Sequence, residues 1–376
     1  MKPLSIVVTS SANPHVKFYY EDLCREEFFD FRALADSDPV RLKAAEEFFK
    51  KRGKDVEFFS DWKAMLEKHR SVEAVMVGSD NFHHCEQTLA AAETGKHVFS
   101  MKVLSMNEGE CREMIRTCRK KKVVLQVELE LHFNGQYQKI RQAVRAGKLG
   151  KIRQIYLSNI SQSPITYYPD WGDPKLSYGN VVPIRPGEAI CRGGAITDHP
   201  HPFDMVRWLT GSEVKKVFAV SGKNMRPQLK VEDHAAITGE LQNGIKFFIN
   251  PSYSHLEEQV PRRQLLWPKS LEVMIKVRGD KGLVAADYWH KPAYVLGDAH
   301  PSPNRLIFEG AGRLPQSFLP EKVIARKFLS HSRLGSFFLS CRGERPVEST
   351  GEDGLAAVRV MNAAYESISS GKVVSL

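Results

Sequence analysis

Two acids and two histidines stand within seven residues near the middle of the chain, where side chains of these types could move a proton or bind a ligand. They are Asp198, His199, His201 and Asp204. A Gly-Gly pair at 193–194 precedes them, and an apolar run that starts at Pro202 and reaches Gly211 follows. Proline suits the first turn of a helix and glycine its end. We therefore expect Asp198, His199 and His201 on the loop that enters a helix, presented to a pocket.

Three interpretations of this cluster are open. The acids could cap helix ends while the histidines make local hydrogen bonds. Histidine and aspartate are also ligands of borderline metals, but the sequence offers no second cluster with fixed spacing, so we assign no metal. In a catalytic interpretation His201 is the candidate base, because the ordinary pKa of histidine lies near neutrality. Asp198 or His199 would then orient the base or the substrate.

The composition predicts an ordinary protein of two domains. The chain has 376 residues, of which 42% are hydrophobic and 26% charged. Its net charge of +10 comes from scattered residues, with one short basic run at 119–122, so no nucleic-acid partner is predicted. The six cysteines show no CxxC spacing, which favours reduced thiols in a cytoplasmic protein. No stretch approaches the roughly 18–20 apolar residues of a membrane span, and no membrane partner is predicted.

Strand and helix patterns alternate through the first third of the chain. Apolar strand patterns occur at 4–8, 31–35, 56–60, 72–79, 97–102 and 123–127. Helix patterns occupy the intervals, namely a stretch ending near Phe29, a segment from Pro39 to Gly53, and 61–68, 82–94 and 108–121. This alternation predicts an α/β domain over residues 1–127 with a doubly wound, Rossmann-like parallel sheet.

The remainder predicts an α+β domain over residues 128–376 with a large open, mostly antiparallel sheet. A helix is expected at 133–149, strands at 152–159, 217–221, 234–242 and 245–250, and a closing helix at 349–371 that packs back between the domains. Asn243-Gly244 predicts a hairpin turn. The segment 161–190 is long and aromatic; Tyr168 and Trp171 could stack on a sugar, or the segment could be a packed structural insert.

Ligands of such parallel sheets bind at the carboxyl ends of the strands. The turn after the first strand lacks the glycines of a dinucleotide fingerprint, but Thr9, Ser10, Ser11 and Asn13 could donate hydrogen bonds. The missing glycines leave three possibilities: weaker cofactor binding, a rearranged turn, or a lost cofactor. Asp36 could accept hydrogen bonds from the adenosine ribose and repel a 2′-phosphate, which favours NAD over NADP. Asp36 could instead cap the helix that starts at Pro39.

Several motifs resemble the Gfo/Idh/MocA family of oxidoreductases over nearly the whole chain. In the central cluster, Gly193-Gly194, Asp198, His201, Asp204 and Leu209-x-Gly211 match the family's substrate-domain signature. Two residues rather than three separate the aspartate from the histidine. Ser79, Asn81 and His84 match its Thr-Pro-Asn-x-x-His motif, with Asp80 in place of the proline. Lys102 matches the active-site lysine, flanked by Met101 and Val103 where the family has glutamate and proline.

The resemblance implies an NAD-linked oxidoreductase that acts on a sugar, polyol or related carbohydrate. It implies that Lys102, His201, Asp198 and His199 are catalytic and that Asp204 contacts the substrate. The aromatic segment 161–190, which the resemblance does not cover, adds Tyr168 and Trp171 as predicted substrate contacts. The predicted cofactor site comprises residues taken from their own chemistry, Thr9, Ser10, Ser11, Asn13 and Asp36, and residues that the resemblance implies, Ser79, Asn81, His84 and Lys102. The family further implies a homo-oligomer. Two alternatives remain: an NAD-recycling lyase or glycosidase, and a cofactor-free binding or regulatory protein.

Overall fold

The computed structural model describes residues 1–161, 194–225, 231–253, 272–289, 294–295, 298–299, 305–310 and 332–376. The chain divides into two compact units. The first contains Met1–Leu129 together with helix α11 (Arg333–Cys341) and the start of helix α12 (Gly351–Ser370) as far as Leu355. The second begins at Glu130 and includes the rest of α12 from Ala356.

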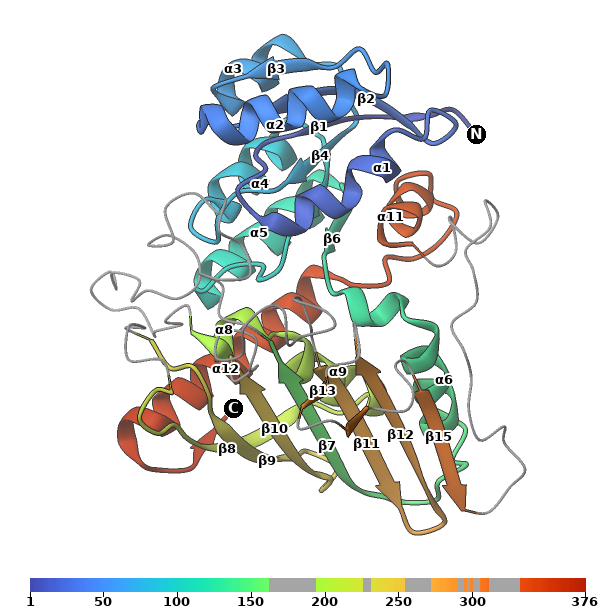
Figure 1. Cartoon of the computed structure of the whole chain (residues 1–376), viewed down its shortest axis with the longest axis vertical. Helices are drawn as coiled ribbons and strands as arrows, with labels where there is room; N and C mark the ends of the chain where they lie inside the picture. Colours follow the sequence, from blue (N-terminus) through green and yellow to red (C-terminus); the bar gives the residue numbers. More distant parts are fainter. Residues whose placement is uncertain are drawn as a thin grey trace. The chain divides into compact units, whose positions relative to one another are not determined.

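The first unit is built on a six-stranded parallel sheet in the order β3-β2-β1-β4-β5-β6 (Figure 1). Its strands are β1 (Leu4–Val8), β2 (Phe29–Ala35), β3 (Glu57–Phe59), β4 (Ala74–Val77), β5 (His97–Ser100) and β6 (Leu125–Val127). Its further helices are η1 (Pro14–Tyr19), α1 (Tyr20–Leu23), α2 (Pro39–Lys50), α3 (Trp62–Lys68), α4 (His84–Glu93) and α5 (Glu108–Lys121). The predicted α/β doubly wound sheet is confirmed, and the strand order reverses between β1 and β4.

The boundary between the first helical segment and the second strand differs from the prediction by several residues. The helix expected to run to Phe29 ends at Leu23, and Phe29 instead starts β2. Phe29 pairs with Leu4 of β1 and is 1% exposed, so the neighbouring strand decides the conformation of this aromatic segment. Such tertiary pairing overrides local pattern.

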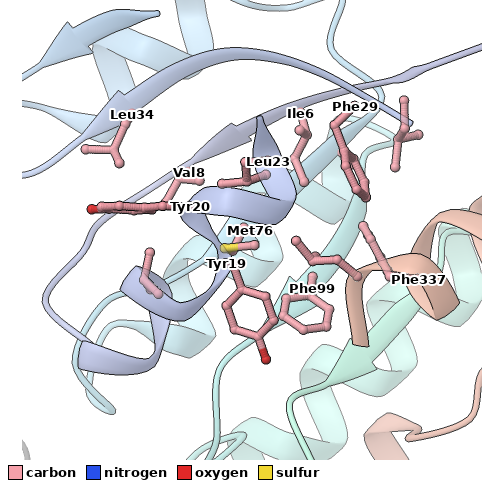
Figure 2. Packing of buried hydrophobic residues seen from close by; sticks show 14 of the residues in the cluster. Ile6, Val8, Tyr19, Tyr20, Leu23, Phe29, Leu34, Met76, Phe99 and Phe337 are labelled. Carbon is pink, nitrogen blue, oxygen red and sulfur yellow. The ribbon is translucent and has the colours of Figure 1, made fainter. Parts of the chain in front are cut away.

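Apolar side chains from distant parts of the chain fill the core beside this sheet. Figure 2 shows Tyr19 and Phe99 together with Phe337 of α11. The rings of Tyr19 and Phe99 meet edge to face at 5.3 Å, and Phe99 lies 5.5 Å from Phe337. Helix α11 therefore belongs to the core of the first unit, although more than 200 residues separate it from β6 along the chain.

An ion pair fixes the end of α11 to the sheet. The guanidinium of Arg342 donates to the carboxylate of Glu73 at 2.6 Å, and Ser5 donates to the same carboxylate through its backbone N–H and its hydroxyl. These hydrogen bonds, first that of Arg342, lower the pKa of Glu73 from 4.5 to about 2. Folding thus stabilises the ionised form of the Glu73 carboxyl relative to its protonated form.

We expect Glu73→Gln to destabilise the protein at neutral pH but progressively less in acid. A carboxyl whose pKa is lowered by folding stabilises the fold above its unfolded pKa, and this contribution is lost as the pH falls from 4.5 to about 2. Urea unfolding of wild type and variant at several pH values measures the difference. A difference that stayed constant down to pH 2 would contradict this assignment.

The second unit is built on an eight-stranded sheet in the order β15-β12-β11-β7-β10-β9-β8-β16 (Figure 1). Its strands are β7 (Ile152–Ile160), β8 (Val214–Val220), β9 (Ala236–Leu241), β10 (Lys246–Ser252), β11 (Glu272–Gly279), β12 (Gly282–Trp289), β15 (Arg305–Gly310) and β16 (Val374–Ser375). β7 and β10 are parallel, and the other neighbours are antiparallel. The predicted open, mostly antiparallel sheet is confirmed. A separate pair, β13 (Tyr294–Val295) and β14 (Asp298–Ala299), is also antiparallel.

Besides α12, short helices of the described residues pack against this sheet or against each other in the second unit. They are α6 (Gly135–Arg145), α8 (Ala195–Asp198) and α9 (His201–Thr210). The helix expected at 133–149 is shorter, because a separate 3-10 turn, η2 (Glu130–Phe133), precedes it and Asn134 caps α6. As predicted, Gly244 forms the hairpin turn with φ of 85°, and Gly211 ends α9 with φ of 70°.

None of the helices in the described residues is both long and apolar enough to cross a membrane. The five cysteines that the structure describes form no disulfide. They are Cys24, Cys85, Cys111, Cys118 and Cys341.

Candidate functional site

The turn after β1 lies against the end of β4 at the point where the strand order reverses. Thr9 donates its backbone N–H to Met76 at 3.0 Å, and Asn13 donates its own to the carbonyl of Gly78 at 2.8 Å. A Cβ atom on residue 78 would lie 2.2 Å from the carbonyl oxygen of Ser10. A glycine directly after the neighbouring strand therefore permits the close approach of the turn here.

Asp36, directly after β2, binds this turn. Its Oδ2 accepts from the N–H of Ser11 at 2.8 Å and from the hydroxyls of Ser10 and Ser11 at 3.1 and 3.0 Å. Arg41 of α2 pairs with Oδ1 at 2.9 Å. Burial opposes ionisation, but the hydrogen bonds from Arg41, Asp38 and Ser11 hold the pKa of Asp36 below its ordinary value. The carboxylate is therefore ionised and already bound within the protein.

The alternative role of Asp36 as a helix cap is wrong. Asp38 caps α2 instead, and its side chain accepts from the N–H groups of Val40 and Arg41. Two of the expected donors of the turn also make protein contacts. The Ser11 N–H binds Asp36, and the Ser10 hydroxyl donates to Asp36 and accepts from the N–H of Ala12 at 3.0 Å.

The segment after β4 carries two buried donors that make no hydrogen bond to the part of the chain that the structure describes. They are the hydroxyl of Ser79 and the amide Nδ2 of Asn81, in residues that are 3% and 1% exposed. Buried polar groups in proteins are normally satisfied, so such atoms mark places where a ligand's polar groups can bind. Both residues belong to the predicted cofactor set and lie at the carboxyl edge of the sheet, where a dinucleotide binds.

His84 ties this segment to the one that follows β5. Its Nδ1 lies 2.7 Å from the carbonyl oxygen of Val103 and its Nε2 lies 3.1 Å from that of Ser79. Burial lowers the pKa of His84, so the neutral ring carries one N–H, which we place on Nδ1 because that contact is shorter. His84 thus positions the segment that bears Ser79 and Asn81.

Lys102 lies two residues beyond β5 at the same edge and is 5% exposed. Its carbonyl accepts from the side-chain amide of Asn13 at 3.2 Å, which links it to the turn after β1. The peptide bond between Lys102 and Val103 is cis. The carboxyl edge therefore brings together a buried cation and two buried donors, and this donor set fits the phosphates, ribose hydroxyls and carboxamide of NAD.

The acid and histidine cluster of the second unit is more helical than predicted. Asp198 is the last residue of α8 and His201 the first of α9, so only His199 and Pro200 connect the helices. The backbone N–H groups of Asp198 and His199 donate to the carbonyls of Gly194 and Ala195, so this segment is helical where the sequence predicts a loop. A Cβ atom on residue 194 would lie 2.3 Å from the carboxylate of Glu232. This close approach explains why a glycine stands at position 194.

His199 is 2% exposed, and its ring contacts described residues of its own unit. Its Nδ1 donates to the carbonyl of Ala195 at 2.9 Å, and its Nε2 lies 3.0 Å from the hydroxyl of Ser161. Pro200 favours extended geometry at His199, which predicts that the side chains of Asp198 and His199 diverge. Instead, Asp198 Oδ2 lies 4.0 Å from Nδ1 of His199. Helical winding in place of extended geometry accounts for this difference.

Asp204 and His201 face the 3-10 turn η2. Asp204, expected to contact substrate, is 1% exposed, and its Oδ2 lies 2.6 Å from Nε2 of the fully buried His132. His201 is 4% exposed, and its Nε2 lies 3.8 Å from Oε1 of Glu130. Sequence reasoning did not identify Glu130 or His132, because neither belongs to a motif and their partners lie about 70 residues away.

Tyr168, Trp171 and Gly193 lie outside the described residues, so the predicted sugar-stacking rings are not placed. Among the residues that are described, no group of three or more histidine, cysteine, aspartate or glutamate side chains is arranged to hold a metal ion.

Two domain models of one family match the chain. Residues 11–129 match the description "Oxidoreductase family, NAD-binding Rossmann fold", and residues 137–285 match the "GFO/IDH/MocA C-terminal domain". The chain belongs to the Gfo/Idh/MocA family. The predictions of an oxidoreductase and of an NAD-binding domain are thereby confirmed.

The relatives found have matching lengths but modest identity. Myo-inositol 2-dehydrogenase of Thermotoga maritima is 26% identical over 81% of this chain and 80% of its own length. The uncharacterized oxidoreductase YrbE of Bacillus subtilis is 26% identical over 96% of this chain and 93% of its own. The WlbA dehydrogenase of Bordetella pertussis, solved with NADH and UDP-GlcNAcA, covers 100% of this chain and 99% of its own at a TM-score of 0.74 and 19% identity. That likeness shows the shared fold.

Proposed function

We propose that this protein is an NAD-dependent dehydrogenase that oxidises a CH–OH group of a sugar, polyol or related carbohydrate. The observation that carries the proposal is the carboxyl edge of the first sheet. Lys102 and the buried donors of Ser79 and Asn81 lie there, in the segments that follow β5 and β4. The relatives named as inositol 2-dehydrogenases and as 1,5-anhydro-D-fructose reductase support a cyclic polyol or sugar as the substrate class.

In this proposal each residue has a defined task. Bound NAD supplies the hydride acceptor. Lys102 holds the substrate hydroxyl and favours its alkoxide, because a positive charge stabilises the developing negative charge. His201 accepts the hydroxyl proton as the general base. Ser79 and Asn81 hold polar groups of the dinucleotide. The proposal also includes the homo-oligomer that the family implies, formed through the outer face of the eight-stranded sheet, where Phe248 is 39% exposed.

The purified protein itself offers the first test. We expect NAD in the supernatant after denaturation, detected by mass spectrometry, or NAD binding by calorimetry. Myo-inositol, glucose and UDP-linked sugar acids are then offered with NAD while absorbance follows NADH. Accumulating NADH supports the dehydrogenase. Product formation without NADH would instead favour the NAD-recycling lyase or glycosidase, and absence of binding to either nucleotide would favour a cofactor-free binding protein.

Asp36→Ala tests the cofactor preference. We expect the wild type to bind NAD at least about tenfold more tightly than NADP, a difference of roughly 1.4 kcal/mol, because the carboxylate repels a 2′-phosphate. The alanine variant should lose that preference, since it also leaves Arg41 available to a phosphate. Calorimetry with both nucleotides measures the ratio.

Asp38→Ala is the matched control for this prediction. Asp38 also pairs with Arg41, at 3.3 Å, and caps α2. Its loss should cost about 1 kcal/mol of stability and leave the preference intact. Equal affinities of the wild type for NAD and NADP would contradict the role given to Asp36.

A further inference from the structure

Two crossed pairs of an acid and a histidine join η2 to α9. η2 contributes Glu130 and His132, and α9 contributes His201 and Asp204. The His132–Asp204 pair is short, at 2.6 Å, and fully buried. The Glu130–His201 pair measures 3.8 Å between Oε1 and Nε2, with Glu130 partly exposed and the ring of His201 buried. The first pair holds the two elements together, and the second places a carboxylate at the proposed base.

The two acids of the sequence motif have other partners. Asp204 is bound to His132, and Asp198 lies in α8 with its carboxylate 4.0 Å from His199. Only His199 and Pro200 separate α8 from α9, and the winding of α8 sets the direction of Asp198. The acid that faces Nε2 of His201 comes instead from η2.

We propose that Glu130 is the positioning residue for His201 and takes the place of the motif acids. The inference rests on the proposed function. In that oxidation the substrate loses its hydroxyl proton to His201 and a hydride to the nicotinamide ring, which leaves a carbonyl compound. Glu130 stays ionised throughout, orients the ring and stabilises the imidazolium that forms. A separation of 3.8 Å exceeds a hydrogen bond, but contacts between catalytic groups often tighten when substrate binds.

The protonation of His201 can be measured without a substrate. Histidine labelled with ¹³C at Cε1 gives one resonance per ring, and His201→Gln identifies the resonance of His201. In the described residues, Glu130 faces this ring at 3.8 Å, and the other titratable groups on the adjoining elements are His132 on η2, Asp204 on α9, and Asp198 and His199 before α9. Removal of one neighbouring negative charge disfavours the imidazolium, so Glu130→Gln should lower the titration midpoint by roughly half to one pH unit.

Asp198→Asn is the matched control, because it removes an acid from the sequence motif with the same change of shape and charge. In the Asp198→Asn variant, the titration midpoint of His201 should stay near that of the wild type. A midpoint that Glu130→Gln leaves unchanged, or that Asp198→Asn shifts more, would overturn the proposal. A structural role alone would lower the melting temperature of Glu130→Gln without moving the midpoint.

The second measurement is turnover, with a substrate identified by the NADH assay under Proposed function. Glu130→Gln should lower kcat about tenfold or more and leave KM and the Kd for NAD within twofold, because it alters the base and not the binding groups. Glu130→Asp should recover part of kcat. A rise in KM at constant kcat, or no rescue by aspartate, would refute a positioning role. If NAD neither binds nor turns over, the proposed function fails, while the titration still reports on the Glu130–His201 contact.

Discussion

Replacement of Lys102 by methionine should abolish turnover and preserve the fold. Methionine has nearly the length and volume of the lysine stem, so the free energy of unfolding should change by less than about 1.5 kcal/mol. The lost charge, however, removes the group proposed to hold the hydroxyl and favour its alkoxide. Loss of such a group lowers turnover by a factor of about 10² to 10³. Steady-state kinetics and thermal unfolding of the same preparation measure both effects.

Lys96 provides the control for Lys102, because the two buried lysines flank the same strand. Lys96 precedes β5, is 4% exposed and donates its Nζ to the carbonyl of Arg70 at 2.8 Å. Burial lowers the pKa of Lys96. Lys96→Met should cost about 1–3 kcal/mol of stability and keep turnover, the reverse of Lys102→Met. Wild-type turnover of Lys102→Met would show that the role given to Lys102 is wrong.

The elements of the first sheet could be predicted because parallel strands buried on both faces are continuous apolar runs. All four residues of β4 are buried, and the sequence shows them as Ala-Val-Met-Val. The end of α9 at Gly211 and the hairpin at Gly244 could be predicted because glycine adopts positive φ without strain. The start of β2 at Phe29 could not, since the choice between helix and strand there depends on pairing with Leu4.

The candidate site could be predicted only as far as the motif residues themselves. Lys102, Ser79 and Asn81 follow strands, so the topology places them at one edge. The Asp36–Arg41 pair had a local signal, an arginine in the first turns of the helix after an acid that ends a strand, and this signal was missed. Glu130 had no such local signal in the sequence, because the packing of η2 against α9 is what brings it to His201.

Breaking the His132–Asp204 pair should cost more stability than the loss of any exposed charge pair in the chain. Both side chains are buried, and the ring of His132 stacks on Trp208 at 4.6 Å with an interplanar angle of 21°. His132→Phe keeps the stacked ring and removes the nitrogen that binds Asp204. A buried carboxylate without that partner costs about 3–5 kcal/mol.

The exposed pair of His83 and Asp80 is the control. It is also short, at 2.8 Å, but the side chain of His83 is 49% exposed. His83→Phe should change the free energy of unfolding by less than about 1 kcal/mol, because solvent screens the pair. Urea denaturation of both variants measures the contrast.

Asp204→Asn then separates a structural role of Asp204 from the substrate contact that its motif implied. If Asp204 holds η2, asparagine keeps the shape but weakens the 2.6 Å contact, so stability falls and NAD-dependent kcat/KM follows only through the population of folded protein. If Asp204 bound the substrate, kcat/KM would fall at unchanged stability. In the double variant His132→Phe/Asp204→Leu both polar partners are gone, and much of the lost stability should return, since an apolar pair of similar volume can replace a buried polar pair. Failure of the double variant to recover would show that the two residues do not act as a pair.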